Sequence, residues 1–416
     1  MASIPFIYFT LWLIAHLRRK DMRFGAGAVA LLWIDISSFF SVLLDIRNLY
    51  GDWGCNDYAI SLGGVLLYCL LWTIVLYPLT RLDNKDIRLS VRKQKLFRYL
   101  CIFFIVCGAI YIFGSGAYAN IIENLQSSRS DAYDSSIDNS SIYSGKRQIL
   151  LWIPMIVSKS WPLLLLCWFI SVSICPQSVW VRFGLLVLSM FLMISGYAGG
   201  GRAQIIWWMI TFIIYYCLFS PFIEAPKRKI IIGLFGGFTA IGIGGIAAIT
   251  LSRFDASVAG YAIDSIIGYA GQPLNNFCSL LPYSDSFHLY SDRIFPLTNF
   301  LLTHQPYDMK EYYEFLGGIY PIQVNVFFTI FGCILMDIGY IGLLVFLLIY
   351  YIITQEICIN KTDIEFSHLI VLAILFCFPV RGLFGWPFLG QLTESLGIFF
   401  SIGLYIIFKY TFKLKS

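Results

Sequence analysis

The chain has 416 residues, of which 58% are hydrophobic and only 13% are charged, with a net charge of +5 and a mean hydropathy of +0.75. A soluble protein of this length carries about a quarter charged residues, so the composition excludes an ordinary soluble enzyme. The apolar blocks of about 18 to 26 residues are long enough to cross a bilayer core of about 30 Å. We therefore expect an all-α, polytopic integral membrane protein whose helical bundle forms one domain over residues 1–416.

The apolar blocks predict about eleven transmembrane helices. Most of the 29 Lys and Arg residues fall in alternate connections, chiefly around 18–23, 81–98, 227–229 and 409–415. Because cytoplasmic loops retain positive charge, this bias places the N-terminus outside and the C-terminus inside. The expected spans are 3–17, 24–44, 59–79, 99–119, 149–174, 179–197, 203–220, 230–250, 322–353, 367–387 and 394–412.

The first outside connection of unusual length covers residues 120–148 and is polar and Ser-rich, as is typical of a solvated loop. The second covers residues 251–321, is rich in Tyr, Asp and Glu, and contains apolar stretches such as SVAGYAIDSIIGYA. A loop with its own helical pattern folds rather than serving as a linker, and large loops on a rigid scaffold tend to carry function. We expect this second loop to be partly helical and to hold the active-site region.

The segment from 322 to 353 is too long for one plain span and has Asp337 and Gly339 at its centre. A carboxyl group inside a membrane needs a partner or water, and Lys159, which falls within another expected span, is one candidate partner. Either one long tilted helix crosses here, or a short re-entrant piece precedes a helix that begins near Asp337. We favour the second arrangement, because the Asp-Ile-Gly triplet has the composition of a helix cap.

The sharpest local motif is the outside connection that contains Gly200, Gly201 and Arg202. Glycines let backbone N–H groups approach an anion closely, a helix N-terminus favours negative charge, and the planar guanidinium group suits phosphate. A short turn with an interfacial arginine is the plainer alternative.

Three more arginines, Arg253, Arg293 and Arg381, fall on the same expected face. Each could simply extend toward lipid headgroups. Four arginines on one face of a chain with few charges could also bind a lipid-linked pyrophosphate together, and they could neutralise it without a metal ion.

For proton transfer, His304 in the sequence LLTHQPYD is the best-placed imidazole, and His288 ranks second. The carboxylates of the large loop are alternative bases for activating a sugar hydroxyl, and the residues do not choose between them. The Tyr density of this loop, which includes Tyr261, favours carbohydrate binding, with an interfacial aromatic belt as the alternative.

Three segments in succession, GGGRAQIIWW, GYAGQPLNNF and NVFFTIFGCILMDIGYIGLL, resemble those of bacterial oligosaccharide repeat-unit polymerases of the O-antigen polymerase type. The resemblance covers roughly Gly196 to Gly342. It implies a multi-pass protein of the bacterial inner membrane with its active face toward the periplasm. Within these segments we expect Asn276, Asn325 and Asp337 to bind substrate.

The reaction that the resemblance implies is transfer of the nascent glycan from undecaprenyl pyrophosphate onto the non-reducing end of a new lipid-linked repeat unit. Arg202 and Arg253 would bind phosphate, Arg293 or Arg381 would assist, and His304 or a loop acid would accept the hydroxyl proton. We expect no cofactor, no metal and no nucleic-acid partner. Besides lipid-linked oligosaccharides and membrane lipid, a chain-length regulator protein is a partner whose need the sequence leaves open.

Two other functions compete with this one. A ligase related to the O-antigen ligases would move a finished glycan to another acceptor, and the DIG and YAGQPLNNF segments argue mildly against it. A flippase for lipid-linked oligosaccharides would show pseudo-repeated halves and charges along a central path, whereas the two halves of this chain are unlike.

Overall fold

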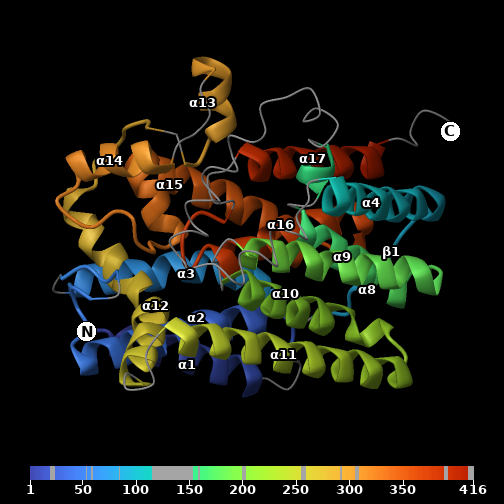
Figure 1. The fold of residues 1–416 in the computed structure, drawn as a ribbon, viewed down its shortest axis with the longest axis horizontal. Coiled ribbons are helices and arrows are strands. Elements are labelled where there is room, and N and C mark those ends of the chain that lie inside the picture. Colours follow the sequence, from blue (N-terminus) through green and yellow to red (C-terminus); the bar gives the residue numbers. More distant parts are fainter. Residues whose placement is uncertain are drawn as a thin grey trace. The chain divides into compact units, whose positions relative to one another are not determined.

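The computed structural model describes residues 1–18, 24–52, 54–57, 60–83, 85–114, 153–157, 160–198, 203–253, 259–290, 293–304, 309–387 and 392–410. These residues are predominantly α-helical (Figure 1), which confirms the all-α expectation. The chain divides into two compact units. The first unit comprises Met1–Asp86, Ile243–Thr362 and Ile374–Ser395, and the second comprises Ile87–Gly242, Asp363–Ala373 and Leu396–Ser416. The expectation of one membrane domain stays a prediction.

The first unit holds the N-terminal helices and the region expected to be the large loop. Its elements are α1 (Ser3–Arg18), α2 (Ala26–Arg47), α3 (Leu62–Leu82), α12 (Ala259–Leu280), the 3-10 turn η3 (Leu281–Tyr283), α13 (Pro296–Thr303), α14 (Met309–Ile319), α15 (Ile330–Gln355) and the π-helical turn η4 (Glu356–Asn360). The segment 251–321 therefore contains helices, as its apolar pattern predicted.

The second unit is also helical and carries the short strands. Its elements are β1 (Arg88–Ser90), α4 (Gln94–Gly114), α8 (Trp161–Ser173), α9 (Val179–Ala198), α10 (Ala203–Phe219), the 3-10 turn η1 (Ser220–Phe222) and β2 (Asp363–Glu365). Three helices have residues in both units: α11 (Ala225–Arg253), α16 (Phe366–Arg381) and α17 (Leu392–Tyr410).

Polar side chains mark the starts of several helices. The hydroxyl of Ser61 accepts a hydrogen bond from the N–H of Gly64 at 3.1 Å, and that of Thr329 accepts one from Gly332 at 3.3 Å. These are ordinary N-caps, which satisfy N–H groups that lack a partner within the helix. At α2 the cap comes from another helix end: the Asp83 carboxylate accepts from Gly27 at 2.9 Å and from Ala28 at 2.7 Å.

Helices lie within all the expected spans, but several predicted boundaries were wrong. The helix α4 begins at Gln94 rather than 99, and α11 begins at Ala225 rather than 230, because both helices start in basic sequence ahead of the apolar block. The expected span 149–174 is interrupted: residues 153–157 are helical, Ser160 is not, and α8 begins at Trp161 with a proline in its first turn, where proline suits a helix start. The helix α16 ends at Arg381 rather than 387.

Five helices in the described part of the chain are long and apolar enough to cross a membrane: Ala26–Arg47, Leu62–Leu82, Gln94–Gly114, Ala203–Phe222 and Ile330–Asn360. Shorter apolar helices accompany them, including Ser3–Arg18 and Trp161–Ser173. These helices are those of a helical membrane protein. The number of eleven spans and the set of loops that face the periplasm stay predictions.

In the first unit, α12 packs most extensively on α2. The helices approach so closely at Gly271 that a β-carbon there would lie 2.6 Å from the carbonyl oxygen of Phe40. Serines of α2 exploit this approach: Ser41 donates to the Gly271 carbonyl and Ser37 to the Ala270 carbonyl, both at 2.7 Å. Small residues with serine hydrogen bonds are the usual contact between helices in membranes, so this crossing fixes the position of α12.

In the second unit, aromatic side chains of α8, α10 and α11 form the packing core. The ring of Phe212 stacks on that of Phe235 with centroids 4.7 Å apart, and Phe169 meets Phe212 edge-on at 5.1 Å. The strands β1 and β2 pair in parallel, with Leu89 opposite Ile364. Stacked and edge-on rings add specific geometry to apolar burial, which gives this unit a core of its own.

Candidate functional site

The helix α15 is broken at Gly339, whose φ of 74° and ψ of −171° are not helical. This conformation is essentially restricted to glycine, and a β-carbon at this position would lie 2.8 Å from the carbonyl oxygen of Asp285. The piece that precedes the break, 330–338, is about 13 Å long at 1.5 Å per residue, which is too short to cross a bilayer. The favoured two-piece arrangement agrees with this break, although its re-entrant placement stays a prediction.

A helix break leaves backbone N–H groups without acceptors in their own helix. The segment that precedes Arg293 supplies carbonyl groups that accept these hydrogen bonds. The N–H of Tyr340 donates to the carbonyl of Asp285 at 3.1 Å, and the N–H of Ile341 donates to the carbonyl of Ser286 at 2.9 Å. Irregular backbone within an apolar helical protein persists only where such groups are satisfied. The segment therefore completes the start of the second helical piece.

The same segment also satisfies the carbonyl groups on the other side of the break. The N–H of Tyr290 donates to the carbonyl of Asp337 at 2.9 Å, and the ring Nε2 of His288 lies 2.8 Å from the carbonyl oxygen of Met336. The hydroxyl of Tyr320 reaches the same Met336 oxygen at 3.5 Å. Burial raises the pKa of Tyr320 above its usual range, so this hydroxyl stays a donor.

We call this arrangement the helix-break site and define it as residues 285–290, 293–294 and 336–341 together with Tyr312. At its centre, the fully buried Asp337 side chain accepts hydrogen bonds from the backbone N–H of Arg293 at 3.2 Å and of Ile294 at 2.8 Å. The Tyr312 hydroxyl donates to the other carboxylate oxygen. The expectation that Asp337 caps the second piece of α15 was wrong, because its carboxylate fastens α14 and the 293–294 backbone to the first piece instead.

The Arg293 side chain enters the same region and is only 9% exposed. Its guanidinium carbon lies 5.9 Å from the Tyr313 ring centroid, and its Nη2 lies 3.2 Å from the position of a β-carbon on Gly385. Arg293 interacts electrostatically with Asp337. A guanidinium group and a buried carboxylate thus share one site, as in many binding sites for charged ligands.

Arg381 is 6% exposed at the end of α16, four residues before Gly385. Its carbonyl accepts a hydrogen bond from the N–H of Phe384 at 3.1 Å, which starts the turn that leads to Gly385. The chain from Arg381 to Gly385 therefore passes beside the Arg293 guanidinium. Two of the four arginines predicted to bind phosphate belong to this region of the first unit.

The two loop histidines differ in their surroundings. His304 is exposed, ends α13 with a left-handed φ of 58°, and donates its backbone N–H to the carbonyl of Phe300 at 2.9 Å. In His288, the Nε2 contact with a carbonyl requires Nε2 to carry the proton, which leaves Nδ1 as the basic nitrogen. That Nδ1 is shielded from solvent and has no hydrogen-bond partner among the described residues. The His288 ring also stacks on Tyr290, with centroids 4.4 Å apart.

The side chain of Asn276 lies in a buried amide network between two of the segments that carry the family resemblance. Its Nδ2 donates to the carbonyls of Gly54 at 3.0 Å and Phe327 at 3.2 Å, and its Oδ1 accepts from the N–H of Asn56 at 2.9 Å. The N–H of Phe327 in turn donates to Gln272 Oε1 at 3.1 Å. These bonds join GYAGQPLNNF directly to NVFFTIFG. The substrate-binding role of Asn276 stays a prediction, since its polar atoms all bind protein groups here.

The remaining predicted residues are not brought into the helix-break site by any described contact. Arg202, Gly200 and Gly201 lie outside the described residues. Arg253 ends α11 and Tyr261 lies in the first turn of α12, but neither side chain is among those described. Asn325 is exposed in the connection between α14 and α15.

Sequence reasoning missed Tyr312 and Asn56 and ranked His288 only second. Tyr312 is one of many tyrosines in the 251–321 segment, and no local pattern separates it from the others. Asn56 lies in a short polar connection far along the chain from its partner Asn276. The one available signal was the polar content of QPLNN within an apolar helix, which calls for buried hydrogen-bond partners.

No family model, curated protein or solved structure matches this chain. Among the described side chains, no group of three or more His, Cys, Asp or Glu residues is arranged to hold a metal ion.

Proposed function

We propose that the protein is a glycosyltransferase that polymerises oligosaccharide repeat units carried on undecaprenyl pyrophosphate. It transfers the nascent glycan from its lipid carrier to the non-reducing end of a new lipid-linked unit, in O-antigen or capsule synthesis. In this proposal the chain crosses the bacterial inner membrane about eleven times, with the segment 251–321 on the periplasmic face.

One observation carries the proposal. The segments GYAGQPLNNF and NVFFTIFGCILMDIGYIGLL, which carry much of the resemblance to repeat-unit polymerases, hydrogen-bond to each other through Asn276, Gln272 and Phe327. The second segment leads directly into the helix-break site, where Asp337 and the nearly buried Arg293 meet. Packing alone would not require a carboxylate and a guanidinium inside an apolar helical unit, where both are costly.

The chemistry requires positive charge at the leaving group. Breaking the bond between the glycan and its carrier releases a pyrophosphate, whose developing negative charge is stabilised by preorganised cations. Arg293 and Arg381 supply guanidinium groups suited to phosphate oxygens, with Arg202 and Arg253 as further ligands by resemblance. Asp337 acts as a positioning residue, since it holds the backbone of Arg293 rather than any substrate atom.

The acceptor hydroxyl must lose a proton as the new glycosidic bond forms. His304, which is exposed, remains a candidate base, and His288 is a second candidate, because its Nε2 contact with the Met336 carbonyl fixes the ring and leaves Nδ1 as the proton acceptor. In this mechanism the proton moves from the sugar hydroxyl to the histidine base while the glycan carbon passes from pyrophosphate to the sugar oxygen. The pyrophosphate departs on the lipid carrier.

The test is deletion of the gene in its native host, followed by a gel of the surface polysaccharide. The proposal predicts single-repeat caps in place of a long ladder. A return of the ladder with the wild-type gene, but not with Arg293→Gln, would place the arginine in the reaction. Arg88, exposed on β1, provides the matched control: Arg88→Gln should restore the full ladder.

The same gel ranks the two histidines. His288→Gln should leave only short products, whereas His304→Gln should retain a ladder if His288 is the base. The reverse ranking would restore His304 to that role. A ligase would instead give free lipid-linked polymer that is not attached to its final acceptor.

A second candidate function is a flippase for lipid-linked oligosaccharides, and the break in α15 favours it. Discontinuous helices with polar groups at the break form substrate sites in many transporters. A flippase predicts loss of all capped product, with lipid-linked units accumulating on the cytoplasmic side. The deletion gel therefore separates the two candidates directly.

A further inference from the structure

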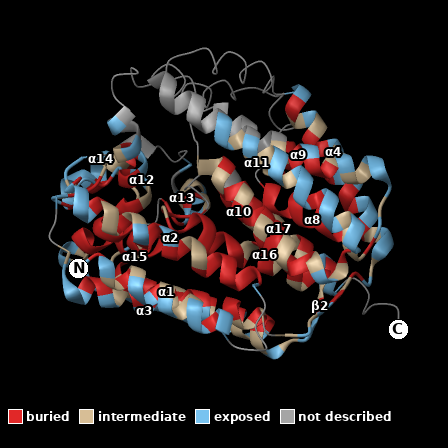
Figure 2. Cartoon of the chain, turned by 90° about the horizontal axis from the view of Figure 1, so that it is seen from below, coloured by how far each residue is buried: buried red, intermediate tan, exposed pale blue. Residues whose placement is uncertain are grey.

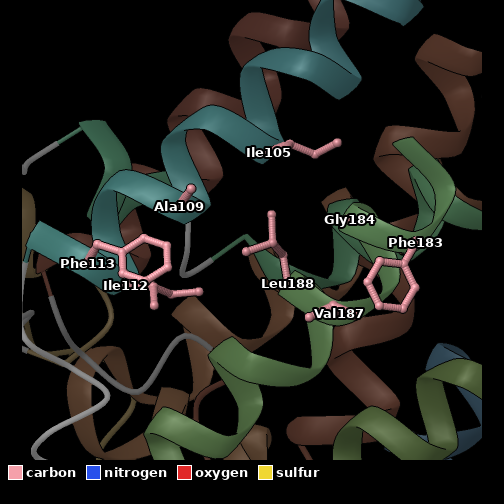
Figure 3. A pocket seen from close by; sticks show the side chains of 8 residues that line it. All are labelled: Ile105, Ala109, Ile112, Phe113, Phe183, Gly184, Val187 and Leu188. Carbon is pink, nitrogen blue, oxygen red and sulfur yellow. The ribbon is translucent and has the colours of Figure 1, made fainter. Parts of the chain in front are cut away.

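The second unit has an apolar groove between α4 and α9 with a volume of about 410 Å³. Figure 3 shows side chains of α4, among them Ile105 and Ala109, on one side and those of α9, among them Val187 and Leu188, on the other. No polar surface lines it. Its lining includes exposed side chains such as Phe113, at 76% exposure, so the groove is open to the surroundings.

Two glycines bring the helices together at the floor of the groove. A β-carbon on Gly108 would lie 2.8 Å from the Leu188 side chain, and one on Gly184 would lie 3.1 Å from Ile105. The groove is thus a gap beside a tight contact. Because α4 is apolar and long enough to span a membrane, hydrocarbon rather than water surrounds this gap.

The N-terminal end of α4 carries two exposed cations, Lys95 and Arg98. Among the described residues neither has an ion-pair or hydrogen-bond partner, in contrast to the nearby Arg92, which pairs with Glu365 at 2.7 Å. The start of a helix adds the positive end of its dipole. This end of α4 therefore attracts anions.

Of these cations, Arg98 lies on the same face of α4 as the groove. Arg98, Ile105, Ala109 and Ile112 follow one another at intervals of seven, four and three residues, which keeps them on one side of a helix with about 3.6 residues per turn. Arg98 precedes Ile105 by about 10 Å along the axis at 1.5 Å per residue. That is a suitable distance between the phosphate of a lipid and the middle of its acyl chain.

Exposed aromatic residues mark the depth of the groove. Tyr99 is 67% exposed beside Arg98 and Trp180 is 82% exposed at the start of α9, and Tyr and Trp favour the level of the lipid headgroups. The groove begins within two turns of each. Figure 2 shows exposed residues along α4, as expected for a helix that faces lipid.

We propose that α4 and α9 form a binding site for an anionic phospholipid, with the phosphate at Lys95 and Arg98 and an acyl chain in the groove. Charge at one end and a wholly apolar groove at the other match the two parts of such a lipid. The site is independent of the helix-break site and of the proposed glycan chemistry, because its residues belong to the second unit.

The test is native mass spectrometry of the full chain released from detergent, with phosphatidylglycerol and phosphatidylcholine of equal chain length. The wild type should retain phosphatidylglycerol preferentially. In Lys95→Ala/Arg98→Ala the affinity should fall by about 30-fold at low ionic strength, the factor that two cations near a membrane surface supply. The control is Arg228→Ala/Lys229→Ala, which removes equal charge from exposed residues near the start of α11 and should change nothing.

The groove is tested separately with Ala109→Phe, which fills it from α4. The wild type should bind a long-chain phosphatidylglycerol more tightly than a six-carbon one, and this ratio of affinities should shrink in Ala109→Phe. The expected decrease is about fourfold for each lipid methylene that the phenyl ring displaces from the groove, while the selectivity for the headgroup remains. Val187→Phe fills the groove from an exposed position on α9 and serves if Ala109→Phe does not fold.

Equal retention of the two phospholipids by the wild type, or equal losses in the cation variant and its control, would overturn the proposal. Displacement of phosphatidylglycerol by a polyisoprenyl phosphate at equal concentration would assign the site to the glycan carrier instead. Retention of phosphatidylglycerol in the presence of the polyisoprenyl phosphate would support a phospholipid as the ligand of this site.

Discussion

Replacing Asp337 by alanine should destabilise the first unit more than almost any other single change. The carboxylate is fully buried and accepts the backbone N–H groups of Arg293 and Ile294 and the hydroxyl of Tyr312. Alanine leaves two backbone donors without an acceptor, and each buried donor left unpaired costs about 1–3 kcal/mol. The free energy of unfolding should therefore decrease by about 2–6 kcal/mol, and the cavity left by the smaller side chain would add to this decrease.

Asp337→Asn is the matched comparison, because its amide oxygen still accepts the two backbone N–H groups. It should cost about 1 kcal/mol, the value of a single exchanged hydrogen bond. Thermal unfolding of the detergent-solubilised protein, followed by the loss of the monodisperse peak in size-exclusion chromatography, compares the variants directly. Equal midpoints for the alanine and asparagine variants would refute the reasoning, since they would mean that the backbone of 293–294 does not depend on this acceptor.

Three further outcomes are expected. Asn276→Ala should lower the unfolding midpoint by several degrees because it empties a buried network, whereas the exposed control Asn325→Ala should leave it unchanged; equal effects would contradict the network. Burial raises the pKa of Cys278 to about 12, so a maleimide should leave this thiol unlabelled in the folded protein at pH 8 and label it after denaturation; rapid labelling of the folded chain would place it at the surface. Burial also raises the pKa of Asp83 above its usual range, so its ionised form costs the folded state free energy. The thermal midpoint of the wild type, measured against that of Asp83→Asn, should therefore fall as pH rises from the usual pKa range of aspartate through the raised pKa of Asp83 in the folded protein. A difference in midpoint that stays constant with pH would contradict this prediction.

The positions of the helices could be predicted from the sequence because apolar blocks must be helical inside a membrane. Their ends were harder. The charged residues at the start of α4 made the helix seem to begin at 99, although α4 includes Lys95 and Arg98 and so extends beyond its apolar block. The apolar composition of a segment shows which part of a helix lies in hydrocarbon. The backbone hydrogen bonds of the helix continue beyond that part into the polar region, so the helix is longer than its apolar block.

The interruption near Asp337 was also predictable, because an acidic residue followed by glycine in an apolar run is costly without a structural role. Its partners were not. The sequence suggested a cation such as Lys159, which lies outside the described residues, whereas the structure supplies backbone N–H groups and the Tyr312 hydroxyl. Those contacts depend on the long-range approach of residues 285–290 and 293–294, which no local pattern encodes.

The measurement that tests the central claim most directly is reconstitution of the purified protein with a lipid-linked repeat unit in liposomes. The account predicts that glycans longer than one unit accumulate on the lipid carrier, that Arg293→Gln abolishes them, and that the exposed control Arg88→Gln does not. Intact single units in the presence of folded wild-type protein, or movement of those units across the bilayer without elongation, would contradict it.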